Sequence, residues 1–124
     1  MYNEYSGFFK SQRDKYFKKI LSNHFKNIPL VVDVGCGQGD FLIQAKELGI
    51  NAEGIDDKDF WVTRCVKKGL KVKKGSIFEI PYDDNSVDGI FLQSVLEHAD
   101  AVKSMKEISR VIKNEGNIAI SCPT

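Results

Sequence analysis

The sequence lacks the cysteine and histidine patterns that mark disulfide-stabilised and metal-binding domains. Its three cysteines, Cys36, Cys65 and Cys122, are odd in number and far apart, and no C-x-x-C pair occurs among the 124 residues. Neither histidine stands at a metal-ligand spacing from them. We therefore expect no disulfide framework, no bound metal and a reducing, cytoplasmic setting.

Long apolar runs and an excess of one charge are also missing. No apolar segment approaches the length of a membrane span, and the N-terminus has no apolar block of signal-peptide length. Lys and Arg total 18 and Asp and Glu total 17, a net charge of +1. This balance gives no reason to expect binding to nucleic acid, and we expect the basic residues of the N-terminal helix, Lys10 and Arg13 among them, to form a solvated face.

The sequence does contain a regular alternation of strand and helix patterns in one domain, 1–124. An N-terminal helical segment, 1–28, carries an amphipathic helix over 8–25, and the core follows at 29–124. Strands are expected at 30–34, 50–56, 70–74, 87–92 and 117–121. Helices are expected at 41–48, at 59–68, and from Asp100 to a stop at 114–116. This alternation predicts an α/β, doubly wound, mainly parallel sheet with a ligand crevice at the carboxyl ends of its strands.

The stretch VVDVGCGQGDF, residues 31–41, places three glycines where the first strand passes into the first core helix. Gly35, Gly37 and Gly39 form G-x-G-x-G, whereas the dinucleotide-binding turn has G-x-G-x-x-G. Glycine lets a ligand approach the backbone because it has no Cβ and tolerates positive φ. The turn therefore predicts a ligand site.

Carboxylates near this turn indicate the kind of ligand. Asp33 precedes the turn and Asp40 follows it. Carboxylates oppose a pyrophosphate at a helix N-terminus, so the pair favours a ligand that joins a zwitterionic amino acid to a cationic sulfur. Asp56 ends the second strand, where an acid holds a ribose diol. The alternative for Asp56 is a turn or helix-capping role, which Asp57 and Asp59 also fit.

Four blocks of sequence resemble the class I S-adenosylmethionine-dependent methyltransferases. In order they are VVDVGCGQGDF, AEGIDDKD, GSIFEIPYDDNSVDGIFLQSVLEH and GNIAISCP, and the resemblance covers 30–123. It is particularly close to the set that acts on small molecules, lipids and quinones. The resemblance implies a Rossmann-like core of strand order 3-2-1-4-5, S-adenosylmethionine as cofactor, S-adenosylhomocysteine as product and methyl transfer to a small-molecule acceptor.

The resemblance also implies cofactor-binding roles for nine residues. Those matching the loop at the methionine end of the cofactor are Asp33, Gly35, Cys36 and Gly37, and Asp56 matches the ribose-binding acid. Those near the adenine or the methyl end are Asp57, Ser76, Ile77 through its backbone N–H, and Gln93. Asp57 replaces an apolar residue that packs on the adenine, and Ser76 replaces an acid that binds its amino group. Both departures predict a weaker hold on the adenine.

No catalytic residue is assigned, because methyl transfer from a sulfonium needs a base only when the acceptor loses a proton. Ser94, Glu97 and His98 follow the fourth strand at the crevice. His98 is the only plausible base there that titrates near neutral pH. The alternative is that Glu97 and His98 have a structural role and stabilise the loop at the start of a helix.

The chain stops just past the fifth strand, where the family usually has two further strands. We therefore expect a truncated or unusually short member of the family. An apolar strand left at the sheet edge predicts either a homodimer through that edge or another element that covers it. Two alternatives to an active methyltransferase are a catalytically inactive cofactor-binding or partner-stabilising module, and an NAD-dependent oxidoreductase, which the glycine spacing and Asp33 disfavour.

Overall fold

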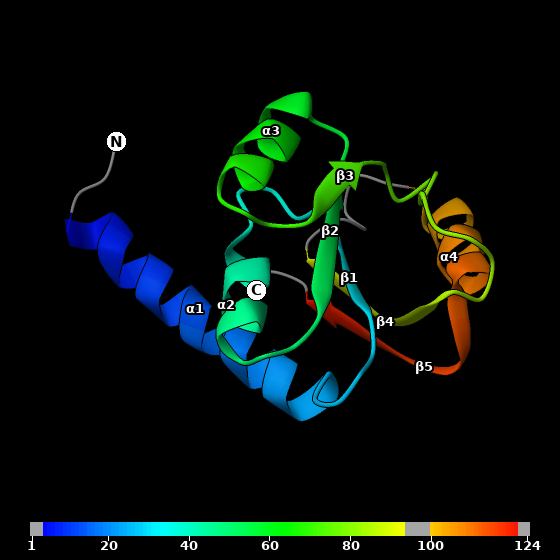
Figure 1. Ribbon diagram of the computed structural model, residues 1–124, viewed down its shortest axis with the longest axis horizontal. Helices are drawn as coiled ribbons and strands as arrows, with labels where there is room; N and C mark the ends of the chain where they lie inside the picture. The colour runs from blue at the N-terminus through cyan, green and yellow to red at the C-terminus, as the bar shows by residue number, and fades with distance from the viewer. Residues whose placement is uncertain (1–3, 94–99, 122–124) are drawn as a thin grey trace.

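A five-stranded parallel sheet with helices on both faces forms the core (Figure 1). This computed structural model describes residues 4–93 and 100–121. In chain order the elements are α1 (Glu4–His24), β1 (Val31–Val34), α2 (Asp40–Glu47), β2 (Ala52–Asp56), α3 (Asp59–Lys67), β3 (Val72–Lys74), β4 (Val87–Gln93), α4 (Ala101–Val111) and β5 (Ile112–Ser121). The strand order is β3-β2-β1-β4-β5, and every neighbouring pair is parallel. The predicted α/β fold and its strand order are confirmed.

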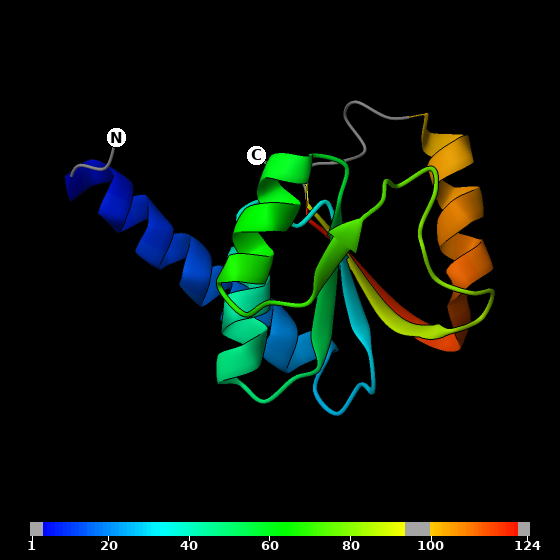
Figure 2. The same cartoon turned by 45° about the horizontal axis from the view of Figure 1, so that its top comes forward.

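Apolar side chains on the two faces of the sheet build two separate cores. All four residues of β1 are buried, because this central strand is covered on both sides. Val31 belongs to the core that contains Phe17 of α1 and Phe41 of α2. Val32 belongs to the core that contains Ile108 of α4. The first three helices therefore lie on one side of the sheet and α4 lies on the other (Figure 2).

Sequence signals locate the ends of α2 and α3 and the start of α4, whereas α4 ends at Val111, before the expected stop at 114–116. Gly49 and Gly69 follow α2 and α3 with φ angles of 72° and 83°, in the left-handed region that favours glycine at helix ends. Asp100 caps α4, and its carboxylate accepts the backbone N–H of Lys103 at 3.0 Å.

The start of β5 differs from the expected strand at 117–121. The chain becomes extended at Ile112, directly after α4, with φ −77° and ψ 140°. The pairing with β4 then shifts from Val87–Ile112 to Gly89–Asn117, so residues 113–116 bulge out of the ladder. Glu115 has a φ of 70° within this bulge. The turn signals at 114–116 therefore mark a bend inside a strand, because Ile112 already pairs with β4.

The two edge strands differ in length and in their side chains. β3 has three residues, of which Lys73 and Lys74 are exposed, and the exposed Lys71 directly precedes it. β5 has ten residues and exposes Ile118 and Ile120 by 41% and 44%. Short, charged edges resist pairing with further strands, whereas long apolar edges permit it.

Candidate functional site

The glycine turn after β1 has a backbone conformation that explains its spacing. Gly35, Gly37 and Gly39 have φ angles of 82°, 53° and 91°, all in the left-handed region. The backbone N–H groups of Gly35 and Cys36 both donate to the carbonyl oxygen of Ile55 at 2.9 Å. A Cβ on Gly37 would meet no atom within 4 Å, so the space beside this residue is open to a ligand.

A cavity of about 320 Å³ adjoins this turn, and we call it the first cavity. It brings together five of the nine predicted residues, Asp33, Gly35, Cys36, Gly37 and Gln93. They come from β1, from the turn and from the end of β4, and these two strands pair side by side in the sheet. The fold therefore assembles these five residues at the carboxyl ends of adjacent strands, where a crevice was predicted.

Asp33 is a buried acid in the first cavity. Its relative exposure is 3%, and no hydrogen bond or ion pair reaches its carboxyl group from the part of the chain that the structure describes. Burial raises the pKa of Asp33 from 3.8 to about 8, and the nearby charge of Asp56 adds to the shift. The carboxyl group is therefore largely protonated at neutral pH, and a cationic ligand group would favour its ionised form.

Asp56, at the end of β2, joins the glycine turn to the segment before α3. Its carboxylate accepts the backbone N–H of Gly37 at 2.9 Å and that of Lys58 at 3.0 Å. The bond to Lys58 is that of an Asx turn, which was the alternative role for this residue. A carboxylate offers about four acceptor positions, so capacity for ribose hydroxyls is left. The ribose role stays a prediction.

Asp40 adds no free negative charge to the first cavity, contrary to the expectation. The guanidinium of Arg13 is ion-paired with its carboxylate, the side-chain amide of Gln38 donates to it at 3.0 Å, and the ammonium of Lys10 lies 3.9 Å away. Lys10 and Arg13 therefore take part in an ion-pair cluster, although their side chains are still 40% and 39% exposed on the helix surface. Packing of α1 against α2 brings both bases to the first turn of α2, which leaves Asp33 as the unpaired acid of this cavity.

Two more of the predicted residues line a second cavity of about 770 Å³ on the β3 side. These are Asp57, whose side chain is 61% exposed, and Ser76. The hydroxyl oxygen of Ser76 accepts the backbone N–H of Phe78 at 3.1 Å, so it already takes part in a turn. The side chain of Ile77 is buried in the core on the α4 side and lines neither cavity. Asp56 lines neither cavity, although it precedes Asp57 of the second cavity and accepts the backbone N–H of Gly37 in the first.

Arg110 of α4 holds the loop that forms the wall of the second cavity. Its guanidinium donates to the carbonyl oxygens of Ile80 and Tyr82 at 2.8 and 3.0 Å and pairs with Asp84 at 2.8 Å. Glu107, one turn earlier, accepts the backbone N–H of Ile80 at 2.6 Å. These contacts fix the loop against α4, so one wall of the second cavity is well defined.

Three residues of the first cavity were not expected there. Arg13 and Phe17 come from α1, and no local signal connects a helix face with a turn so far along the chain. Trp61 did have a signal, because it stands in the first turn of the helix that follows β2 and so starts at the same edge of the sheet.

Groups with catalytic chemistry are few in the described part of the chain. Ser94, Glu97 and His98 lie outside the described residues. Cys36 and Cys65 are free and buried, and burial raises the pKa of both thiols, which makes them poor nucleophiles. Within residues 4–93 and 100–121, no group of three or more His, Cys, Asp and Glu side chains could hold a metal ion.

None of the helices within the described ranges has both the length and the apolar character needed to cross a bilayer.

Comparison with known proteins identifies the family. A family model described as a methyltransferase domain matches residues 32–120. The demethylmenaquinone methyltransferase of Lactobacillus johnsonii is 31% identical over 87% of this chain and 48% of its own length. A sterol 24-C-methyltransferase of Schizosaccharomyces pombe is 33% identical over 69% of this chain and 25% of its own length. The chain spans less than half of these two relatives.

A solved structure agrees with this assignment. The crystal structure of a SAM-dependent methyltransferase from Archaeoglobus fulgidus superposes with a TM-score of 0.77 and 27% identity, covering 98% of this chain and 59% of that protein. The chain therefore belongs to the methyltransferase domain family, and the resemblance to class I S-adenosylmethionine-dependent methyltransferases that its motifs indicated is confirmed.

Proposed function

We propose that this chain binds S-adenosylmethionine at the glycine turn and presents the methyl group to a small-molecule acceptor. The observation that carries the proposal is the buried, unpaired Asp33 in a cavity beside a left-handed glycine turn with open space at Gly37. Similarity to the Archaeoglobus protein supports the cofactor. Similarity to quinone and sterol methyltransferases supports a small acceptor.

The residues of the first cavity suit the proposed ligand. S-adenosylmethionine supplies an electrophilic methyl group on a sulfonium. Asp33 would bind the ammonium of the methionine end and would ionise as it does so. Asp56 keeps acceptor positions for the ribose hydroxyls, and Gln93 lies at the end of β4, where its amide would orient the methyl end. The protein's contribution is then alignment of the reacting groups, which is the main requirement of a displacement at carbon.

The adenine would lie in the second cavity under this proposal. Ser76 would offer its hydroxyl, and Asp57 would offer a polar surface where an apolar one would pack better. Ile77 does not line this cavity, so the predicted contact through its backbone N–H gains no support from the lining. Because the Ser76 hydroxyl already accepts a hydrogen bond and Asp57 is exposed, we expect a weaker hold on the base than on the methionine end.

Calorimetry and thermal unfolding with S-adenosylmethionine, S-adenosylhomocysteine and NAD test the proposal. The first two ligands should bind and the third should not. At a ligand concentration about a hundredfold above the dissociation constant, stabilisation should reach about 2.7 kcal/mol. Trp61 is the only tryptophan and lines the first cavity, so its fluorescence gives an independent signal. Binding of NAD, or of no ligand at millimolar concentration, would exclude the proposal.

A catalytically inactive binding or partner-stabilising module is the second candidate. It is favoured by Asp57 and Ser76, which depart from the family pattern at the predicted adenine site. Release of S-adenosylhomocysteine on incubation with pools of small acceptors supports an enzyme. Tight cofactor binding without turnover across such pools supports the module.

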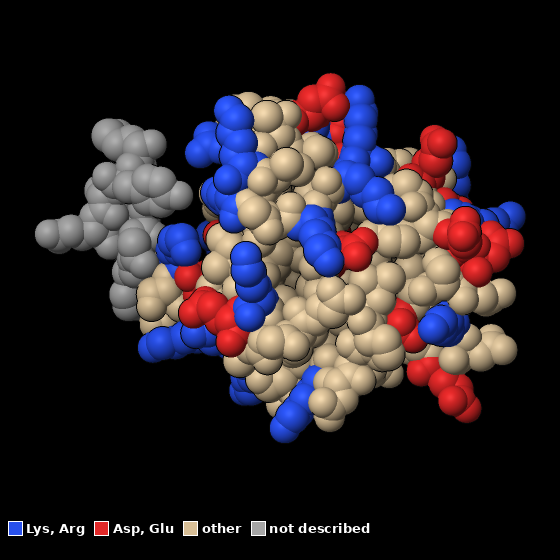
Figure 3. Space-filling model, viewed as in Figure 1, with Lys and Arg blue, Asp and Glu red and all other residues tan. Residues whose placement is uncertain are grey.

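We further propose that the protein is cytoplasmic and does not bind nucleic acid. Free thiols at Cys36 and Cys65 suit a reducing compartment. On the face shown in Figure 3, Lys and Arg side chains are interspersed with Asp and Glu, so no broad basic surface is present there.

The proposed homodimer would form along the exposed edge of β5. Ile118 and Ile120 are 41% and 44% exposed on this strand, and pairing would cover them. Sedimentation should show a dimer that Ile120→Lys dissociates, while Val66→Lys, at an apolar residue of α3 that is 54% exposed, should leave it intact. A wild-type monomer at high concentration would rule the dimer out.

A further inference from the structure

We propose that the outer surface of α3 docks on an anionic phospholipid membrane. This surface, which we call the α3 face, consists of five exposed side chains of that helix: Phe60, Thr63, Arg64, Val66 and Lys67. The α3 face lines neither of the two cavities described above. The inference therefore goes beyond the proposed function and does not depend on which cofactor the chain binds.

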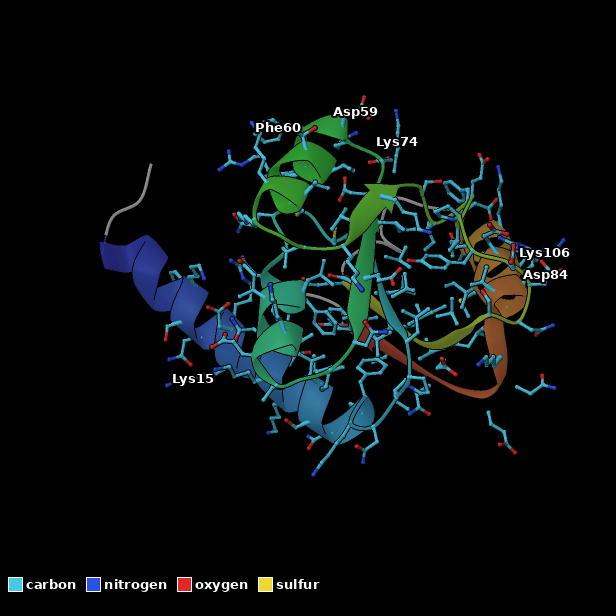
Figure 4. All side chains as sticks on the ribbon, viewed as in Figure 1. Lys15, Asp59, Phe60, Lys74, Asp84 and Lys106 are labelled. Carbon is cyan, nitrogen blue, oxygen red and sulfur yellow. The ribbon has the colours of Figure 1, made fainter. Side chains whose placement is uncertain are left out.

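Positive charge is concentrated in the segment that carries the α3 face. Residues 58–74 contain seven Lys and Arg side chains and one acid, a net charge of +6, whereas the whole chain has a net charge of +1. The remaining residues are therefore net negative. The one acid, Asp59, is paired with Lys74 at 3.2 Å (Figure 4). This uneven distribution of charge orients the α3 side of the protein toward an anionic surface.

Three bases of this segment keep their charges available to lipid head groups. Arg64, Lys67 and Lys71 are all exposed. Within residues 4–93 and 100–121, no carboxylate forms an ion pair with any of the three, and the guanidinium of Arg64 lies 5.3 Å from the centre of the Phe60 ring. Lipid phosphates could approach these bases without breaking an ion pair of the folded protein.

Two exposed apolar side chains on the same face favour lipid over nucleic acid. Phe60 is 58% exposed and Val66 is 54% exposed. A surface helix that carries aromatic and aliphatic side chains fringed by Lys and Arg lies at the boundary between head groups and acyl chains. Bases of a nucleic acid could stack on Phe60, but Val66 gives them no aromatic ring. Insertion into lipid would cover both side chains.

The α3 face lies next to the first cavity. The ring of Phe60 meets the ring of Trp61 edge-on, with 4.9 Å between their centres, and Trp61 lines that cavity. Docking by the α3 face would therefore hold the first cavity close to the lipid surface. It would also place the indole of Trp61 beside the membrane, so tryptophan fluorescence should shift to shorter wavelength when vesicles bind.

Co-sedimentation with vesicles tests the inference. One set of vesicles is phosphatidylcholine alone, and the other is phosphatidylcholine and phosphatidylglycerol in equal parts. We expect the wild type to bind the anionic vesicles at least about tenfold more tightly, and Phe60→Ser and Lys67→Glu each to lose about tenfold. The matched controls are Val102→Ser, at a residue of α4 that is 69% exposed, and Lys106→Glu on the same helix (Figure 4). Both controls should change binding by less than about twofold.

Three outcomes would overturn the inference. The first is equal binding of the wild type to both kinds of vesicle, or binding to neither. The second is a loss in Val102→Ser and Lys106→Glu as large as in the α3 variants, which would assign binding to overall charge or to another surface. The third is tight binding to a single-stranded oligonucleotide, lost in Lys67→Glu, without binding to vesicles. No cofactor is added in any of these measurements, so failure of the proposed function leaves their result unchanged.

Discussion

The two cavities on either side of Asp56 differ in how far the protein prepares them for a ligand. In the first cavity a left-handed glycine turn, the buried Asp33 and the anchored Arg13 are in place before any ligand arrives. In the second, Asp57 is exposed and the Ser76 hydroxyl is already bonded. Groups that are fixed in advance contribute more to affinity than groups that must be reorganised. Under the proposed function, we therefore expect recognition to be concentrated on the amino-acid side of the ligand.

The strongest test of this difference is to remove one acid from each cavity. Asp33→Asn should weaken S-adenosylmethionine binding by about 2 kcal/mol, or roughly 30-fold, because a buried charge-assisted contact is lost. Asp57→Asn should change it by less than about twofold, because an exposed charge is screened. Calorimetry of both variants gives the comparison. Equal losses in the two variants would show that the cavities do not differ in this way.

A second test uses the pH dependence of the first cavity. The pKa of Asp33 is about 8 in the folded protein, above its ordinary 3.8, so folding takes up a proton between these values. The free energy of unfolding should therefore fall as pH rises through this window, by at most about 1.4 kcal/mol per pH unit. Cofactor affinity should change in the opposite sense and rise toward pH 8, because binding the ammonium releases that proton.

Urea unfolding and calorimetry at pH 6 and pH 8 measure both trends. Asp33→Asn is the matched variant, and it should remove the contribution of this residue to each. If the wild-type trends persist unchanged in Asp33→Asn, other titrating groups cause them.

The glycines beside the two cavities should respond differently to a methyl group. Gly37→Ala places a Cβ in open space at a φ of 53°, so stability should fall by only about 1 kcal/mol while ligand affinity falls further. Gly75→Ala brings a Cβ to 2.6 Å from Cδ of Pro81. It should destabilise the fold by about 1–3 kcal/mol through overpacking. Thermal unfolding with and without S-adenosylhomocysteine separates the loss of stability from the loss of affinity. A larger loss of affinity in Gly75→Ala than in Gly37→Ala would contradict the proposed role of the glycine turn in ligand binding.

The smallest expected effect is a gain in the second cavity. Ser76→Asp provides a charged acceptor for the adenine amino group and should tighten S-adenosylmethionine binding by up to about 1 kcal/mol, or roughly fivefold. Ser86→Asp, at the other end of the loop between β3 and β4, serves as a control for added charge. Unchanged calorimetric affinity in Ser76→Asp would show that the adenine does not lie against this residue.

The sheet was predictable because its signals are local. A parallel strand that is buried on both faces needs an uninterrupted apolar run, and the β1 segment VVDV has one apart from Asp33. Helix ends at Gly49 and Gly69 were predictable for the same reason, since the left-handed conformation there selects glycine. The bulge before Asn117 was not, because turn residues report the local bend and not the pairing of Ile112 with β4.

The site was predictable only where it follows from the order of the strands. Asp33, Gly37 and Gln93 meet because β1 and β4 are neighbours with known direction. The ion pair between Arg13 and Asp40 joins residues 27 positions apart, and it depends on how α1 packs against α2. No sequence pattern predicts the angle at which α1 packs against α2. The net charge of the cavity therefore could not be predicted from its acidic residues alone.

The lysines along β3 limit how far the sheet can grow. A second copy that joins at β5 would use up the receptive edge of both chains, and only two guarded margins, each with Lys71, Lys73 and Lys74, would face the solvent. Such an association closes on itself at two subunits. In the proposed homodimer, these three side chains would oppose the head-to-tail addition of further chains.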